Sequence, residues 1–301
     1  MSIFVSVPTL KDPEILTTIT SAFNNADDPS SISMGVAAFV DEEFYKDLVH
    51  HTSNIKNLFI DRYDEEINTG VGVGRIYAKL RYDSQDMFLQ VDSHTYFDKG
   101  WDAAVSILWK DALNDTKNSK TVVSGYLPPY TKQDGSVCKD DGYFRYSIFT
   151  KDLGCIDWNK VSWIDMPLYK FYKTEKRFIP ATKVSGTFIL SDYQYAENSG
   201  HVYNTKLFDE EIIQSIELLS SGYSLVFPNV NIPIFHFYGD PRRQTTKSTL
   251  KEMEVAIEMY LEENPIKCKM WEEYAQVNLM DSTFKKWYIP KTYRGELCQS
   301  L

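Results

Sequence analysis

Apolar, strand-like segments alternate with helical segments along the first third of the chain, and this alternation restricts the possible folds more than any other feature. Residues 3–8, 31–40, 57–60 and 87–92 have the apolar character of buried strands. Segments with helical patterns separate them, the last of these over residues 75–80. Strands that are separated by helices lie parallel and are joined by right-handed crossovers. The sequence therefore predicts an α/β fold whose mainly parallel sheet is flanked by helices.

Acidic and hydroxyl residues mark the expected starts of the helices. Asp12, which precedes Pro-Glu, is predicted to cap the first helix. Asp41, Asp102 and Asp209 are predicted to begin later helices in the same way. Thr249 opens a capping box, and the amphipathic helix that follows it is expected to run to about residue 262.

No stretch rich in Pro, Gly or Ser divides the 301 residues, so a single domain is predicted. Within it we distinguish residues 1–130, residues 131–247 and a C-terminal helical segment, 248–301. Residues 131–142 are polar and rich in turn formers, which predicts a mobile loop. Residues 183–190 are predicted to return as a strand.

Net charge and cysteine usage limit the partners and the compartment. The formal net charge of −10 argues against bulk binding to nucleic acid or to an anionic membrane. The chain begins with a strand and has no long apolar segment, so neither a signal peptide nor membrane insertion is expected. The four cysteines form no Cys-x-x-Cys pair. Reduced thiols in the cytoplasm are the simplest interpretation.

Asp92 and His94 stand where the apolar strand over residues 87–92 ends. Residues i and i+2 of extended backbone point the same way, so both side chains can reach one point. A carboxylate oxygen and an imidazole nitrogen suit a divalent ion such as Mn²⁺. Because open α/β folds bind nucleotides at the carboxyl edge of the sheet, this pattern indicates a metal-dependent nucleotide-sugar enzyme.

Further residues can be assigned either to structure or to such a site. His236, inside an apolar strand over residues 232–237, is either a packing residue or a third metal ligand. With Asp92 and His94 it would leave positions open for phosphate oxygens and water. Gly186 either permits close approach of a ligand or marks a bulge.

Charged residues offer the remaining candidates. Three consecutive acids, Asp209, Glu210 and Glu211, either favour a helix N-terminus or face a sugar or an acceptor hydroxyl. Arg75 follows a glycine-rich segment that lacks the spacing of a phosphate-binding loop. Arg75 and Arg242 could each neutralise a diphosphate, or could be ordinary surface arginines.

The chain resembles the GlcNAc-transferase family that acts on polypeptide hydroxyls, whose best-known members modify hydroxyproline in a cytoplasmic ubiquitin-ligase subunit. The resemblance lies in residues 3–8 with 11–14, and in residues 88–94 with 100–102. The family's variant of the Asp-x-Asp motif is Asp-Ser-His, matched here by residues 92–94. Landmarks follow in order up to about residue 243, at Gly74-Arg75, Gly186, Glu210-Glu211, Gly222, Pro228 and His236.

This resemblance implies a GT-A fold and a retaining transfer from a UDP-sugar, carrying GlcNAc or another hexose, to a hydroxyl of a protein, a glycan or another molecule. It implies a bound Mn²⁺ or Mg²⁺. Residues 1–130 would bind the nucleotide and 131–247 the sugar and the acceptor, with residues 131–142 covering the acceptor. The implied site residues are Val5, Ser6 and Val7 for the nucleoside, Asp92, Ser93, His94 and His236 around the metal, Arg75, Gly186 and Arg242 near the donor, and Asp209, Glu210 and Glu211 for catalysis.

Two other classes of protein stay open on the sequence alone. A catalytically silent nucleotide- or glycan-binding module would keep the fold and the aromatic residues without needing an open metal site. A metal-dependent phosphoesterase would need more acidic or histidine ligands, often for two metals, and the sequence offers no second cluster.

Overall fold

The computed structural model describes residues 1–67, 70–139, 176–198, 208–238 and 258–275. An eight-stranded sheet forms the centre of the molecule, in the order β3-β2-β1-β4-β10-β6-β11-β9. Its strands are β1 (Ile3–Leu10), β2 (Ile32–Phe39), β3 (Leu58–Tyr63), β4 (Met87–Val91), β6 (Thr121–Ser124), β9 (Phe178–Pro180), β10 (Phe188–Ser191) and β11 (Ser224–Pro228).

The sheet is mixed but mainly parallel. Strands β3, β2, β1 and β4 run parallel to one another, and β6 runs parallel to β11. Strand β10 lies between β4 and β6 and is antiparallel to both, and β9 is antiparallel to β11 at the edge. The predicted α/β class is confirmed.

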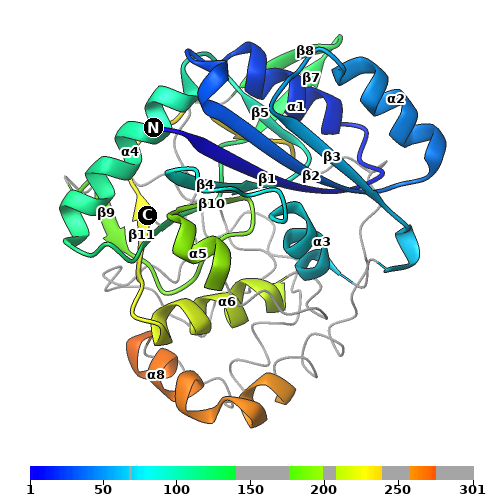
Figure 1. The fold of residues 1–301 in the computed structure, drawn as a ribbon. Coiled ribbons are helices and arrows are strands. Elements are labelled where there is room, and N and C mark those ends of the chain that lie inside the picture. The colour runs from blue at the N-terminus through cyan, green and yellow to red at the C-terminus, as the bar shows by residue number, and fades with distance from the viewer. Residues whose placement is uncertain (68–69, 140–175, 199–207, 239–257, 276–301) are drawn as a thin grey trace.

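Helices cover both faces of this sheet (Figure 1). In the view of Figure 1, α1 and α2 lie above the sheet, and α3, α5 and α6 lie below it. Because both faces are covered, β1 and β4 are buried along almost their whole length, which explains their nearly continuous apolar sequences. The helices are α1 (Ile15–Asn24), α2 (Glu42–Thr52), α3 (Val71–Ala78), α4 (Trp101–Thr116), α5 (Tyr193–Asn198), α6 (Phe208–Ser220) and α8 (Pro265–Ala275).

Three predicted helix caps are wrong, and one is confirmed. Helix α6 begins at Phe208, so Asp209 lies inside it and is not its cap. Asp41 does cap α2, because its side chain accepts the Phe44 N–H at 2.9 Å. Helix α1 begins only at Ile15, and Asp12 lies before it in a turn. Asp102 lies inside α4, where its carboxylate accepts the backbone N–H groups of the distant Asp27 and Asp28, both at 2.9 Å. A buried carboxylate satisfies whichever donors the tertiary fold brings to it, and local sequence does not reveal them.

The loop predicted over residues 131–142 is also wrong for its described part. Residues Tyr130–Gln133 (β7) and Ser136–Lys139 (β8) form an antiparallel hairpin. Its two turn residues, Asp134 and Gly135, have φ values of 50° and 78°. Asp-Gly with positive φ at both positions is the signature of a type I′ hairpin turn, so the signal was present in the sequence.

Other element boundaries shift for identifiable reasons. Helix α3 begins at Val71, four positions before the predicted start, and includes two glycines. A Cβ on Gly74 would lie 2.8 Å from the Pro8 Cβ, so this glycine lets α3 pack closely on β1. Of the strand predicted over 183–190, only the last part enters the sheet, as β10.

Helix α6 begins at Phe208, and Gly222, with φ of 83°, lies just beyond its end. Residues 258–263 are helical, while the predicted start of that helix at Thr249 lies outside the described residues. Among the described helices, none combines the length and apolar character needed to cross a bilayer. The subdivision at residues 130 and 247 stays a prediction.

Candidate active site

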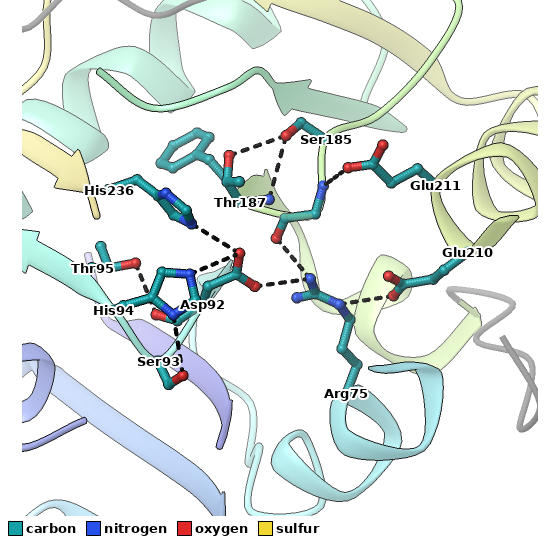
Figure 2. A network of polar contacts seen from close by, with 12 residues as sticks. Arg75, Asp92, Ser93, His94, Thr95, Ser185, Thr187, Glu210, Glu211 and His236 are labelled. Atoms are coloured by element: carbon teal, nitrogen blue, oxygen red, sulfur yellow. Dashed lines mark hydrogen bonds and ion pairs between the residues drawn. The ribbon is translucent and has the colours of Figure 1, made fainter. Parts of the chain in front are cut away.

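Asp92, His94 and His236 come together at the carboxyl end of β4 (Figure 2). One potential ligand atom from each residue lies within 4.8 Å of the others. His236 Nε2 is 3.1 Å from Asp92 Oδ2, and His94 Nε2 is 3.9 Å from the same oxygen. The structure therefore brings the three predicted metal ligands together, and the role of His236 as a ligand stays a prediction.

A short β ladder brings His236 to a motif that lies far from it in sequence. Strand β12 (Ile234–His236) pairs antiparallel with β5 (Thr95–Phe97), which directly follows the motif. The Phe237 N–H donates to the His94 carbonyl at 2.9 Å, and the His236 N–H donates to the Pro128 carbonyl at 2.9 Å. These backbone bonds hold the His236 ring against the Asp92 carboxylate.

The Asp92 carboxylate is held in its charged form. Burial acts to raise its pKa, but the hydrogen bond to His236 and the positive charges around it, chiefly Arg75, outweigh burial and hold the pKa well below the ordinary value. One ionised carboxylate and two imidazoles form a mixed oxygen and nitrogen donor set. Such a set fits a divalent transition-metal ion such as Mn²⁺.

Arg75 links this group to the interior of the fold. Arg75 as a whole is only 2% exposed. Nη2 lies 3.1 Å from Asp92 Oδ1 and donates to the Gly186 carbonyl at 2.9 Å, and Nε lies 2.8 Å from Glu210 Oε1. Burial lowers the pKa of Arg75, but the Glu210 and Asp92 charges raise it by more, so the guanidinium stays charged. Within the described part of the chain, Nη1 is buried without a hydrogen-bond partner, so a donor remains for an anionic group.

Gly186 is required because the chain passes close to Arg75. A Cβ at this position would lie 2.6 Å from Arg75 Nη2. The Gly186 N–H donates to Glu211 Oε1 at 2.7 Å, while its carbonyl accepts from Arg75. The group that approaches Gly186 closely is thus a protein side chain, and the predicted approach of a ligand stays a prediction.

Glu210 and Glu211 are both buried, at 2% and 6% exposure, and both face cations. Glu210 pairs with Arg75, and Glu211 pairs with the buried Lys183. The Tyr126 hydroxyl donates to Glu211 Oε2 at 3.2 Å. Burial lowers the pKa of Lys183, opposed by the charge of Glu211, and burial together with that same charge raises the pKa of Tyr126. These carboxylates thus do more than favour a helix N-terminus: they hold Arg75 and Gly186 in place.

Other predicted site residues lie apart from this group or outside the described residues. Val5, Ser6 and Val7 lie in the middle of β1 and are fully buried. Their part in nucleoside binding stays a prediction. Arg242 lies outside the described residues, and so does the side chain of Asp209.

Sequence reasoning missed two features of the site. Asp12 was assigned to a helix cap, yet its Oδ2 lies 2.7 Å from His94 Nδ1 and accepts the Ser93 hydroxyl at 2.9 Å. Lys183 was assigned to a strand, yet it neutralises Glu211. An aspartate before proline and a lysine among apolar residues carry no local signal of such distant partners.

Many solved structures share this architecture, and TarS and GalNAc-T7 are two of them. Residues 1–349 of TarS from S. aureus, in complex with UDP-GlcNAc, match with a TM-score of 0.56 at 11% identity, over 91% of this chain and 71% of that one. GalNAc-T7 with UDP, GalNAc and Mn²⁺ matches with a TM-score of 0.59 at 12% identity, over 96% of this chain and 56% of that one. The chain thus spans little more than half the length of GalNAc-T7. The architecture is the GT-A fold of glycosyltransferases.

The glycosyltransferase (GlcNAc) family model matches residues 41–279, which is most of the chain. The chain belongs to this glycosyltransferase family, and the resemblance noted in the sequence is confirmed. A comparison with curated proteins finds no match.

Proposed function

We propose that this glycosyltransferase uses UDP-GlcNAc, or another UDP-hexose, and a divalent cation to glycosylate a hydroxyl acceptor with retention of configuration. The observation that carries the proposal is the meeting of Asp92, His94 and His236 within 4.8 Å, beside a buried arginine. Support comes from the relatives, since TarS is seen with UDP-GlcNAc and GalNAc-T7 with UDP, GalNAc and Mn²⁺.

Asp92, His94 and His236 would hold the cation through oxygen and nitrogen. When bound, a divalent cation offsets the charge that develops on the leaving diphosphate. Three protein ligands leave coordination positions for diphosphate oxygens and water, as a catalytic site requires. The cluster itself lies at the carboxyl edge of the sheet, where α/β folds bind nucleotides.

Arg75 adds a fixed positive charge to the same place. Its guanidinium is oriented by Asp92, Gly186 and Glu210 before any ligand arrives, so little reorganisation is needed during the reaction. The buried Nη1 group supplies N–H donors for a diphosphate oxygen. We assign to Arg75 the stabilisation of the leaving group.

In this proposal Glu210 and Glu211 position other groups of the site and do not act as general bases. Glu210 is committed to Arg75, and Glu211 to Lys183, Tyr126 and the Gly186 N–H. A retaining transfer of this kind breaks the bond from C1 of the sugar to the diphosphate and forms a new bond to the acceptor oxygen on the same face. The departing phosphate oxygen takes the acceptor proton, so a dedicated protein base is not needed. Asp209 keeps its predicted role beside the donor sugar.

The hairpin β7–β8 is the element we assign to the acceptor. It begins next to the strand that carries His236, through a bridge between Pro129 and His236. The Tyr130 ring stacks on Phe237 with centroids 5.2 Å apart. Lys132, 2.5 Å from Glu14, ties the hairpin to α1. We propose that a hydroxyl of a protein or a glycan binds at this hairpin. We also propose that the protein acts in the cytoplasm, where UDP-sugars are available.

The proposal is tested by measuring UDP release from a panel of UDP-sugars, with Mn²⁺ or with EDTA. We expect one donor, UDP-GlcNAc or a close relative, to be turned over only with the metal, and Asp92→Asn to lose this turnover. Asp111→Asn is the control, because Asp111 pairs with Arg177 at 2.7 Å on the surface of α4. NMR of the product's anomeric proton shows whether configuration is retained.

The other two classes give different outcomes in this experiment. Binding of a UDP-sugar without turnover of any donor would favour a silent binding module. Metal-dependent release of phosphate from simple phosphate esters would favour a phosphoesterase. Turnover that survives EDTA and the Asp92→Asn change would contradict the assigned metal group.

A further inference from the structure

Asp12 lies between β1 and α1 with a side chain that is only 5% exposed. One carboxylate oxygen, Oδ1, accepts the Glu14 N–H at 2.8 Å and shapes the turn before α1. The other oxygen, Oδ2, accepts the Ser93 hydroxyl at 2.9 Å and lies 2.7 Å from His94 Nδ1. Oδ1 thus stabilises the turn next to Asp12 in sequence, while Oδ2 contacts the Asp-Ser-His motif more than 80 positions away.

The contact with His94 selects one tautomer of the ring. An ionised carboxylate can only accept hydrogen bonds, so the proton between Asp12 and His94 belongs to Nδ1. With its proton on Nδ1, His94 keeps the lone pair of Nε2, which is the atom nearest to Asp92.

The backbone around His94 is held by other groups. The Thr18 hydroxyl donates to the Ser93 carbonyl at 2.7 Å and accepts the Thr95 N–H at 2.9 Å. We therefore expect the backbone from Ser93 to Thr95 to keep its conformation without Asp12. What Asp12 adds is control of the ring, namely its orientation and the position of its proton.

We infer that Asp12 is a positioning residue that prepares His94 as a metal ligand, by holding Nδ1–H and directing the lone pair of Nε2 toward Asp92 and His236. The inference deepens the proposed function and rests on it in one respect, that the three residues bind a divalent cation. A carboxylate behind a ligating imidazole is a common way to fix the tautomer and raise the basicity of the ligand.

The first measurement needs no substitution. Long-range ¹H–¹⁵N NMR spectra of the metal-free wild-type protein report which ring nitrogen of His94 carries the proton, with the signals assigned through single histidine variants. We expect protonated Nδ1 and unprotonated Nε2 in His94. A ring with its proton on Nε2 overturns the inference, whatever the protein binds.

The second measurement uses Asp12→Asn, which preserves the shape of the side chain. Both oxygens of Asp12 face donors, so an asparagine must turn its NH₂ group toward one of them. The Glu14 N–H cannot become an acceptor, whereas the His94 ring can by moving its proton to Nε2. An isosteric amide is known to fix the wrong tautomer of an imidazole in this way. We expect the tautomer to change and the affinity for Mn²⁺ to fall about 10- to 100-fold.

Asp102→Asn is the matched control for this variant. Asp102 is also a buried carboxylate that accepts backbone N–H groups, those of Asp27 and Asp28, and it does not contact the metal group. We expect it to lower the melting temperature while leaving the affinity for Mn²⁺ unchanged, as titrated by EPR of the free ion. Equal loss of Mn²⁺ affinity in both variants would reduce Asp12 to a structural role and overturn the inference.

The two proposals fail in distinguishable ways. Wild-type protein that binds no Mn²⁺ contradicts the proposed metal site, and the tautomer measurement still decides the role of Asp12. Wild-type protein that binds Mn²⁺ with an Asp12→Asn variant of equal affinity and unchanged tautomer refutes the inference and leaves the proposed function standing.

Discussion

At the scale of single residues, the site is a chain of buried charges in which each group positions the next. Lys183 pairs with Glu211, Glu211 accepts the Gly186 N–H, the Gly186 carbonyl accepts from Arg75, and Arg75 contacts Asp92. Each buried charge has an opposite charge beside it, since an unpaired one would be strongly unfavourable in this environment. The position of Asp92, the proposed metal ligand, is therefore coupled to glutamates in the first turn of α6.

Gly186→Ala is predicted to disturb this chain with a single methyl group. The added Cβ would lie 2.6 Å from Arg75 Nη2, so either the turn or the guanidinium must shift. We expect a loss of about 100-fold in the rate of UDP release, because displacement of a catalytic group by about 1 Å has effects of this order. Kinetics of purified Gly186→Ala decide the matter, and a rate within twofold of wild type would contradict the close approach.

Lys183 and Glu211 are predicted to behave as a coupled pair. Lys183→Met leaves Glu211 buried and unpaired, and we expect it to lower the free energy of unfolding by about 3–5 kcal/mol. Adding Glu211→Gln to that variant removes the second charge while keeping an oxygen for the Gly186 N–H, so most of the loss should be recovered. Urea denaturation of both single variants and the double variant measures the coupling. Additive losses would show that the two side chains act independently.

At the scale of elements, short pairings place the site. The ladder of β5 with β12 brings His236 to the motif, and β10 carries the chain from the Gly186 turn into the sheet between β4 and β6. Helix α3 packs on β1 closely enough for Arg75 to reach Asp92. His236, Arg75 and Asp92 are distant in sequence, and they thus meet through elements of only three to eight residues.

The end of α6 offers a test of element stability that is separate from the site. Gly222 follows α6 with φ of 83°, and no atom of the described residues lies within 4 Å of where a Cβ would be placed. Gly222→Ala therefore meets backbone strain alone, which we expect to lower the free energy of unfolding by about 1 kcal/mol. Chemical denaturation measures this difference. An unchanged denaturation midpoint would mean that residue 222 can adopt another backbone conformation without lowering the free energy of unfolding.

At the scale of the whole molecule, the core is made of apolar side chains, and we expect it to form without a metal. The larger cluster of buried apolar side chains runs from β1 through β4 and β10 to β11 on the described part of the sheet. The proposed metal ligands lie at the edge of that core, where Asp92 and His94 are partly exposed and His236 is buried. We therefore expect a metal to stabilise the folded protein only by binding to it, by an amount that depends on the metal concentration.

Metal addition is predicted to raise the melting temperature without being needed for folding. At a Mn²⁺ concentration 100 times the dissociation constant, linkage stabilises the protein by about 2.7 kcal/mol, which corresponds to several degrees. EDTA should return the melting temperature to the metal-free value, and Asp92→Asn should show no response to Mn²⁺. Loss of the far-ultraviolet circular dichroism spectrum in EDTA would instead reveal a structural metal.

The sequence by itself determined the α/β class, most strands of the parallel half and the direct neighbourhood of Asp92 and His94. These depend on apolar periodicity and on the geometry of residues i and i+2, both of which are local. Only the tertiary structure decided that Asp12 faces His94, that Lys183 neutralises Glu211 and that Arg75 needs a glycine at position 186. The physical reason is that a buried polar group must find a partner, but the fold alone decides which distant residue supplies it.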